Sequence, residues 1–423
     1  MTLEAWVGLG IFLVTYLVIA TEWLHKTVAA MAGGVAMVLL GIVTQEQAFE
    51  EIDFNVIFLL AGMMILAAII RKTGVFGWLA VRSARFAGGD PYRILVVLSV
   101  ITAGASAFLD NVTTVVLVGP ITLFLAARMG LNPMPFIIAE VLASNIGGTS
   151  TLIGDPPNIL IGSAADIDFA TFAANMGPLA LIILVLFLVA ARWLFRNHLQ
   201  VDPELRDSLL ALDEREMIAD PRLLRTSLAV LGLTLVGFLL HGALHLEPAT
   251  IALAGAVLLM VVARQDPHEV LGQVEWPTLF FFIGLFMVVA GVIEIGLIQA
   301  VANALIEITG GALTAGAFVI LWISAILSAF VDNIPYTATM IPVVEQMSEP
   351  HGGSQALWWA LAAGADLGGN ATIIGASANV ILANMAEREG HPITFGTFFR
   401  YAAPVTFGSI VVSMAYIWVR YLA

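Results

Sequence analysis

Long apolar runs constrain this chain more than any other feature of its sequence. They recur around residues 3–24, 173–191 and 402–419, and each approaches the roughly 20 residues that a helix needs to cross a bilayer. Only 11% of the residues are charged, and the mean hydropathy is +0.97. A soluble domain carries about 25% charged residues. The sequence therefore predicts an all-α polytopic membrane protein, because hydrocarbon admits only segments that satisfy their own backbone hydrogen bonds.

The same composition argues against several classes of function. The first apolar run follows "MTLEAW", which has no basic n-region, and no small-residue cleavage pattern comes after the run, so we expect a retained helix. The sequence contains no cysteine, hence no disulfide framework, iron–sulfur site or thiolate metal site. The net charge of −14 argues against a nucleic-acid partner. Since HExxH, GxSxG and histidine clusters are absent, we predict no enzyme, no metal and no cofactor.

The placement of the 17 Lys and Arg residues predicts an orientation. Lys26 follows the first run, five basic residues lie in 71–93, and six lie in or beside 196–222, whereas 44–53 contains none. Cytoplasmic segments of membrane proteins carry an excess of basic residues. We therefore expect the N-terminus outside, 196–222 as a cytoplasmic linker, and a location in the bacterial inner membrane.

The chain repeats itself across that linker. "SAFLDN" at 106–111 matches "SAFVDN" at 328–333 with an offset of 222, and "NIGGTSTLIG" at 145–154 matches "DLGGNATIIG" at 366–375 with an offset of 221. Several matches at one nearly constant offset indicate two homologous halves. We predict halves at 1–195 and 223–423, of about five spans each.

Charge predicts how these halves are related. The five basic residues of 71–93 have no counterparts in the equivalent segment 294–312. Equivalent segments then face opposite sides of the membrane. This is an inverted-topology repeat, which is a recurring architecture of secondary transporters.

Each half carries two polar interruptions at matching places, an Asp-Asn pair and a glycine-rich stretch. Glycine and proline prevent a continuous helix, and the freed backbone groups with Asn, Ser and Thr oxygens bind small solutes or cations. Intramembrane carboxylates are costly and mark functional sites. The predicted substrate and ion ligands are Asp110, Asn111, Asn145, Ser150, Thr151, Asn158, Asp332, Asn333, Asp366, Asn370, Thr372, Ser377 and Asn379.

A second set of residues is predicted to shape the breaks. Asp155 precedes two prolines and is expected to cap the helix that starts there. The set consists of Gly147, Gly148, Gly154, Asp155, Pro156, Pro157, Gly368, Gly369 and Gly375.

The stretches "LDNVTTVVLVGPI", "AEVLASNIGGTSTLIGDPPNILIG" and "FVDNIPYTATMIP" resemble the ion transporter superfamily. The similarity is to its branch of ArsB-type arsenite/antimonite permeases, NhaD-type sodium/proton antiporters and the melanosomal P protein. The resemblance implies two inverted repeats, each with a re-entrant hairpin and a broken helix. It also implies a binding site between the hairpin tips and the breaks, and transport driven by the proton gradient.

The resulting hypothesis is proton-coupled efflux of arsenite or antimonite, with Asp110, Asp332 and Asp366 as the proton-titrating carboxylates. The neutral hydroxide As(OH)3 offers donors and acceptors that Asn, Ser, Thr and backbone groups satisfy without a thiol. Sodium/proton antiport of the NhaD type is the nearest alternative, followed by a dicarboxylate carrier and a passive channel for neutral hydroxides. Candidate partners are a second copy of the chain and an arsenic-pump ATPase.

Overall fold

In the computed structural model, the described residues are 2–21, 23–199 and 217–423. Most of the predicted linker 196–222 therefore lies outside the described residues. Every regular element in the described part of the chain is a helix. The first half contains α1 (Leu3–Thr21), α2 (Lys26–Leu39), α3 (Gln45–Glu50), α4 (Phe54–Arg71), α5 (Val75–Phe86), α6 (Pro91–Ser106), α7 (Asn111–Arg128), α8 (Met134–Gly148), α9 (Pro156–Ala164) and α10 (Phe169–Leu194).

The second half contains the same kinds of element in the same order. They are α12 (Pro221–Leu244), α13 (Pro248–Val262), α14 (Pro267–Leu271), α15 (Trp276–Glu294), α16 (Leu297–Thr309), α17 (Leu313–Ser328), α18 (Asn333–Ser348), α19 (Ala356–Gly368), α20 (Ser377–Arg388) and α21 (Phe395–Ile417). Short turns η2 (Glu349–His351), η3 (Gly369–Ala371), η4 (Ile373–Gly375) and η5 (Trp418–Leu422) complete it.

Helix length and composition confirm the predicted fold class. Among the described residues, seven helices are long and apolar enough to cross a membrane: α1, α4, α7, α10, α12, α15, and α21 together with η5. Six further apolar helices are shorter, with 10–17 residues. The protein is therefore an all-α, polytopic membrane protein.

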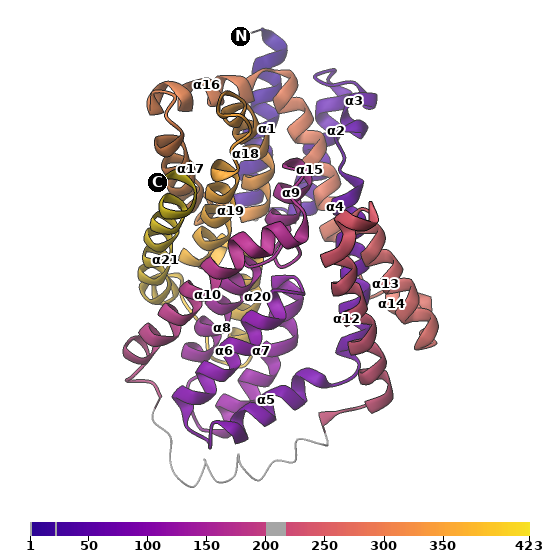
Figure 1. Cartoon of the computed structure of the whole chain (residues 1–423), viewed down its shortest axis with the longest axis vertical. Helices are drawn as coiled ribbons and strands as arrows, with labels where there is room; N and C mark the ends of the chain where they lie inside the picture. Colours follow the sequence, from indigo (N-terminus) through magenta and orange to yellow (C-terminus); the bar gives the residue numbers. More distant parts are fainter. Residues whose placement is uncertain (1, 22, 200–216) are drawn as a thin grey trace.

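Equivalent helices of the two halves lie at opposite ends of the molecule, which favours the predicted inverted repeat. α6 and α17 begin 222 residues apart, as do α7 and α18. In Figure 1, α5 lies across the lower end of the molecule and its counterpart α16 across the upper end. α1 starts at the upper end, and α12 starts at the lower end. The division into inverted halves remains our proposal for the origin of this arrangement.

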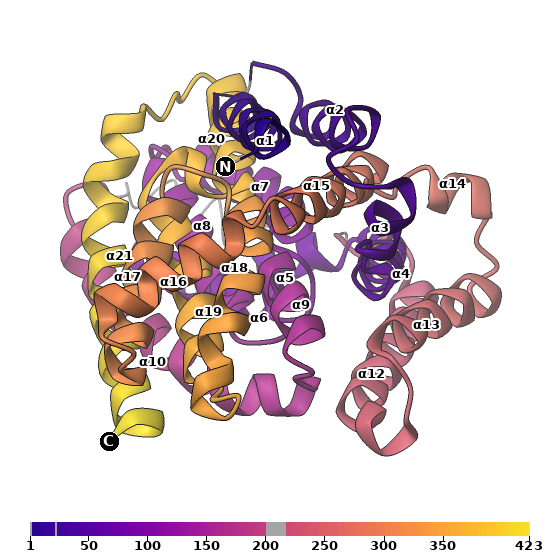
Figure 2. The same cartoon turned by 90° about the horizontal axis from the view of Figure 1, so that it is seen from above.

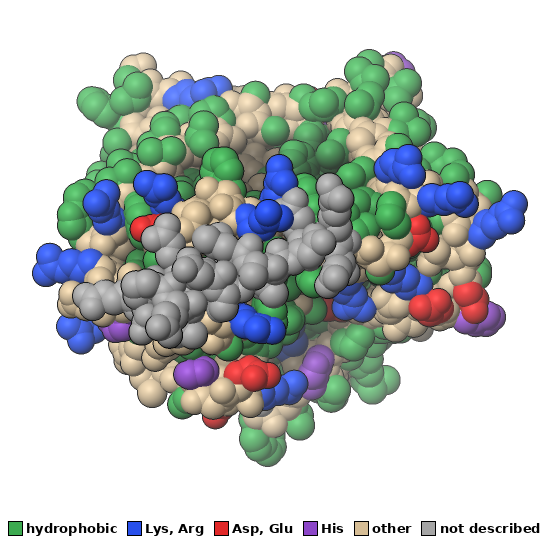
Figure 3. All heavy atoms as spheres, turned by 90° about the horizontal axis from the view of Figure 1, so that it is seen from below, with side chains coloured by type: hydrophobic (Ala, Val, Ile, Leu, Met, Phe, Trp, Pro, Cys, Tyr) green, Lys and Arg blue, Asp and Glu red, His purple; other side chains and the backbone are tan. Residues whose placement is uncertain are grey.

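Basic side chains lie at the same lower end. Lys and Arg spheres are spread over the face seen from below in Figure 3, and the basic helix α5 lies there. An excess of Lys and Arg marks the cytoplasmic side of a membrane protein. The predicted orientation, with the basic segments on the cytoplasmic side, stays a prediction.

The helices form two groups. α1–α4 and α12–α15 pack mainly on one another, α2 against α15 and α4 against α13, and we call this group the framework. α6–α10 and α17–α21 form the second group, in which α6 packs on α8 and α17 on α19, and we call it the site body. Figure 2 shows α12, α13 and α14 at one side of the molecule and α10, α19 and α21 at the other. α5 and α16 connect the two groups.

Glycines let the helices of the site body approach closely. A Cβ on Gly147 of α8 would lie 2.2 Å from the Ala103 carbonyl oxygen of α6. In the second half, a Cβ on Gly368 of α19 would lie 2.5 Å from the Ala325 Cα of α17. Small residues at such contacts are the usual device for packing helices in a membrane. The packing of α6 on α8 and of α17 on α19 therefore requires these glycines.

Replacing Gly147 by alanine should destabilise the protein, because the new methyl group meets backbone and not a flexible side chain. We expect a loss of about 1–3 kcal/mol, the usual cost of overpacking, visible as a lower midpoint of thermal unfolding in detergent.

Gly104→Ala is the matched control on α6, since nothing lies within 4 Å of its Cβ position. This variant should unfold at the parent temperature or slightly above it, because alanine favours helix. Equal midpoints for the two variants would contradict the packing argument.

Candidate functional site

The site lies where two hairpins and two broken helices meet. The pairs α6–α7 and α17–α18 enter from the lower and upper ends respectively (Figure 1), and each pair turns at its Asp-Asn element. α8–α9 and α19–α20 are the broken helices, interrupted at 149–155 and 369–376. Each break is fastened to the hairpin of its own half. Thr151 donates to the Ala107 carbonyl, and Thr372 donates to the Ala329 carbonyl.

The unwound stretches satisfy their carbonyl groups with asparagine. Asn158 Nδ2 donates to the carbonyl oxygens of Gly148 (3.1 Å) and Thr151 (3.2 Å). Its counterpart Asn379 donates to those of Gly369 (2.9 Å) and Thr372 (2.8 Å). Broken backbone inside a membrane persists only when its polar groups find such partners. These two asparagines therefore have a structural task in each half.

Backbone also meets backbone within each break. A Cβ on Gly154 would lie 2.5 Å from the Gly148 carbonyl oxygen, and a Cβ on Gly375 would lie 2.5 Å from that of Gly369. Any side chain at these positions would force the break open. The predicted shaping role of these four glycines fits this geometry.

A bridge of amides joins the two breaks. Asn145 Nδ2 donates to Asn370 Oδ1 at 2.8 Å and to Asn379 Oδ1 at 3.1 Å. All three side chains are buried. The broken helices of the two halves thus contact each other directly at the centre of the site body.

Asp155 connects both hairpins. Asn111 Nδ2 of the lower hairpin donates to it at 2.5 Å, and Asn333 Nδ2 of the upper hairpin donates to both of its oxygens at 3.3 Å. Asn111 in turn accepts from the Ser106 hydroxyl at 2.5 Å. The predicted capping role of Asp155 is wrong, since its side chain makes no cap bond at the start of α9. The adjacent prolines, Pro156 and Pro157, occupy the first turn, where no such bond is needed.

The same region holds a second buried carboxylate. Asp366 is fully buried, and it is near enough to Asp155 for the two charges to repel each other. Asn158 and Thr149 face it, yet neither carboxyl oxygen has a hydrogen-bond partner of good geometry among the described residues. Two buried carboxylates that repel each other are stabilised when a proton neutralises one of them or when a cation binds between them. The pair is suited to holding one or the other.

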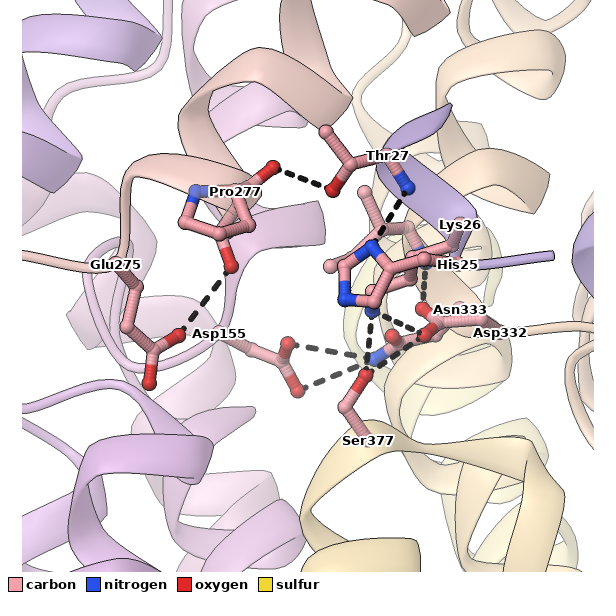
Figure 4. Close-up of polar contacts among 11 residues, drawn as sticks. His25, Lys26, Thr27, Asp155, Glu275, Pro277, Asp332, Asn333 and Ser377 are labelled. Carbon is pink, nitrogen blue, oxygen red and sulfur yellow. Dashed lines mark hydrogen bonds and ion pairs between the residues drawn. The ribbon is translucent and has the colours of Figure 1, made fainter. Parts of the chain in front are cut away.

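The two Asp-Asn elements, although alike in sequence, have different surroundings. Asp110 accepts from the Thr113 backbone N–H (2.8 Å) and hydroxyl (2.5 Å), and so caps α7. Asp332 caps α18 through Ile334, and it also accepts from Lys26 Nζ at 2.9 Å and from Ser377 Oγ at 2.8 Å. Figure 4 shows Lys26 reaching Asp332 from the start of α2. Lys26 thus neutralises Asp332 in one Asp-Asn pair, whereas Asp110 in the other pair is bonded to Thr113.

A cavity of about 710 Å³ opens between the framework and the site body. Its polar lining comes from both groups of helices, and its carboxylates outnumber its basic side chains. The lining includes His25, Lys26, Asp110, Asn111, Asp155, Glu275, Asp332, Asn333 and Ser377.

The remaining predicted ligands do not line this cavity. Asn145, Asn158, Asp366, Asn370, Thr372 and Asn379 form the buried network at the breaks. Ser150 donates to the Gly147 carbonyl at 2.5 Å, and Thr151 is bonded to its own hairpin. Neither hydroxyl lines the cavity.

Sequence reasoning missed three titratable residues of the cavity lining. From the sequence, Lys26 served only to predict the orientation, and its ion pair with Asp332 was not expected. Glu275 precedes α15 and is close enough to Asp110 for repulsion. His25 lies next to Lys26 in the turn between α1 and α2. A His-Lys pair between two apolar runs was the one available signal.

The comparisons with known proteins agree with this fold. Residues 16–364 match the family described as "CitMHS: Citrate transporter". The chain belongs to this transporter family. Its membership confirms the predicted superfamily, and it confirms that the protein is a membrane transporter and not an enzyme.

Individual relatives extend the comparison over the whole chain. An uncharacterized transporter of Mycobacterium tuberculosis is 44% identical over 422 residues, which cover 98% of both chains. The human P protein is 35% identical over 492 residues, and the match covers 96% of this chain and 59% of the P protein. The YdaH transporter of Alcanivorax borkumensis shares the fold, with a TM-score of 0.55 at 15% identity over 98% of both chains. The arsenite-permease and NhaD branches remain predictions.

The sharing of Asp155 by two amides predicts non-additive mutations. Asn111→Ala and Asn333→Ala each remove a donor to the same carboxylate. We therefore expect the double variant to differ from the sum of the single variants by about 0.5–3 kcal/mol, as residues of one network do. Unfolding free energies in detergent measure the difference.

Asn175→Ala supplies the control, because Asn175 bonds to Thr171 and Tyr421 in a separate network on α10. Its combination with Asn111→Ala should be additive within about 0.5 kcal/mol. Additivity of the Asn111 and Asn333 substitutions would rule out the shared carboxylate.

Proposed function

We propose that the protein is a proton-coupled exporter of small inorganic hydroxides, with As(OH)3 and Sb(OH)3 as its cargo. The observation that carries this proposal is the buried pair Asp155 and Asp366 at the crossing of the broken helices. Such a pair stores a proton when it is closed off from water and releases it when it faces the other side.

The chemistry of the cavity supports a neutral cargo. Four carboxylates line it, Asp110, Asp155, Glu275 and Asp332, against one lysine. Free citrate, which the family description names, is an anion that this excess of negative charge repels. A neutral hydroxide is not repelled, and the amides of Asn111 and Asn333 are placed to donate to its oxygens.

Alternating access follows from the two groups of helices. The cavity lies at their seam, so that a displacement of the site body against the framework would close it on one side and open it on the other. In our proposal Asp366 and Asp155 carry the proton, and Asp110 and Asp332 respond to the cargo at the hairpin tips. Proton entry from outside then drives cargo out of the cytoplasm.

We place the protein in the bacterial inner membrane, with the N-terminus outside and the linker in the cytoplasm. The basic lower end supports that orientation (Figure 3). A homodimer and an arsenic-pump ATPase remain candidate partners, and purification of the chain from its own membrane is the way to detect either.

Sodium/proton antiport is the second candidate function. The excess of carboxylates over basic groups in the cavity favours a cation as much as a proton, because carboxylate and amide oxygens are ligands for small hard cations. A dicarboxylate carrier would need more positive charge in the cavity lining. A passive channel would not need the Asp155–Asp366 pair.

Proteoliposomes distinguish these functions. With a pH gradient imposed across the membrane, As(III) should accumulate against its own concentration gradient, because the flow of protons down their gradient drives its transport. Sodium should leave the gradient unchanged. Dissipation of the gradient by Na⁺ without As(III) movement would replace our proposal by sodium/proton antiport, and As(III) equilibration without a gradient would indicate a channel.

Removing the titratable group should uncouple transport. Asp366→Asn keeps the size of the side chain and abolishes proton binding, so we expect proton-driven accumulation to fall about tenfold or more. Asp155→Asn should act in the same way. Asp90→Asn is the control, since Asp90 caps α6 and asparagine caps equally well. If the Asp366→Asn variant accumulates As(III) as fully as the parent, Asp366 does not couple transport to protons.

A further inference from the structure

One ion pair crosses the seam between the framework and the site body. Lys26 begins α2 in the framework, and its Nζ reaches Asp332 at 2.9 Å and Ser377 Oγ at 2.7 Å. Asp332 lies at the tip of the hairpin α17–α18, and Ser377 begins the second limb of the broken helix α19–α20. Ser377 Oγ also donates to Asp332 at 2.8 Å. The three side chains therefore close a triangle, which Figure 4 shows on the cavity wall.

The lysine is held from the framework side as well. Its ammonium lies 5.1 Å from the centre of the Phe281 ring on α15, which is within the range of a cation–π contact. The Lys26 and Asp332 side chains are 26% and 13% exposed. Removing one partner of this partly buried pair leaves the other charge without compensation, and this disfavours the conformation in which the pair forms.

The pair has no equivalent on the other side of the repeat. Asp110 matches Asp332, but the position that matches Lys26 at the same offset is Pro248. Asp110 accepts from the Thr113 backbone N–H and shares the cavity with another carboxylate, Glu275. The lower hairpin thus has no bond of this kind to the framework among the described contacts, while the upper hairpin has one.

We propose that Lys26, Asp332 and Ser377 form a latch that holds the site body in the present conformation and opens once in each transport cycle. Tyr16 also bonds across the seam to Pro335 and Thr339 of the upper hairpin, but of these contacts it is the Lys26–Asp332 contact that carries charge. The cavity beside the latch shows that the two groups do not close on each other here. Because the latch occurs at one hairpin only, it favours one of the two conformations of the cycle. Lys26 is then a positioning residue that sets the balance between them.

This inference rests on the proposed function only in that the protein alternates between two conformations. Neither the cargo nor the coupling ion enters it. The experiment below uses no cargo, so that a failure of arsenite transport leaves its outcome unaffected.

The absence of native cysteine permits a direct measurement of the conformational balance. Asn384 of α20 is exposed and lines the cavity, and a single Asn384→Cys substitution provides one reactive site there. A membrane-impermeant maleimide is applied to vesicles of each orientation, and the ratio of the two labelling rates reports the balance. Lys26→Met in this background should shift the ratio about tenfold, which corresponds to about 1.4 kcal/mol.

Two variants test whether the charge itself matters. Lys26→Arg keeps a cation and should keep the labelling ratio within about threefold of the parent, a change below 1 kcal/mol. Ser377→Ala removes one of the two latch bonds of the lysine and should give a ratio between those of the parent and Lys26→Met. Ser377→Ala also tests the latch if Lys26→Met fails to fold, and gel filtration in detergent would reveal that failure.

Lys72→Met is the matched control. Lys72 pairs with Glu269 at 2.9 Å, and both residues belong to the framework, so this substitution removes an ion pair that does not cross the seam. It should leave the labelling ratio unchanged. Parent-like ratios in both Lys26→Met and Ser377→Ala would overturn the latch, and so would an equal shift in Lys72→Met.

Discussion

The structure depends on finding partners for backbone groups that the broken helices leave free inside a membrane. Asn158 and Asn379 supply them, each by donating to two carbonyl oxygens of its own unwound stretch. Because those amides are committed to backbone, the asparagines hold the breaks in one shape. The carboxylates at the crossing are then positioned by rigid elements, which is the condition for a site that binds and releases a small solute reproducibly.

Much of this arrangement was predictable from sequence. The apolar runs determined the fold class, and the two offsets of 221 and 222 identified the elements that meet. Repeated motifs reveal such partners because both copies face the same physical problem. The predicted ligands Asn111 and Asn333 indeed contact one carboxylate together.

The roles of individual carboxylates were harder to predict from the sequence. The charges of Asp155 and Asp366 repel each other, although neither has a carboxylate at its matching position in the other half, where Ala376 and Asn145 stand. Comparison of the two halves therefore predicted Asp155 only as a residue that shapes the break, and it gave no reason to pair Asp155 with Asp366. Lys26 shows the same limit, since a contact that spans 306 residues leaves no local pattern.

The contacts of α1 and α2 also bear on how the protein is assembled. Tyr16 donates to the Pro335 carbonyl at 2.8 Å and bonds to Thr339, so these first helices contact the upper hairpin at several points. During synthesis they enter the bilayer long before that hairpin exists. Until the second half is inserted, the Lys26 ammonium lacks the Asp332 carboxylate that pairs with it here, and an uncompensated charge is costly in lipid. Insertion of the upper hairpin thus supplies a late electrostatic step that draws it towards the first helices.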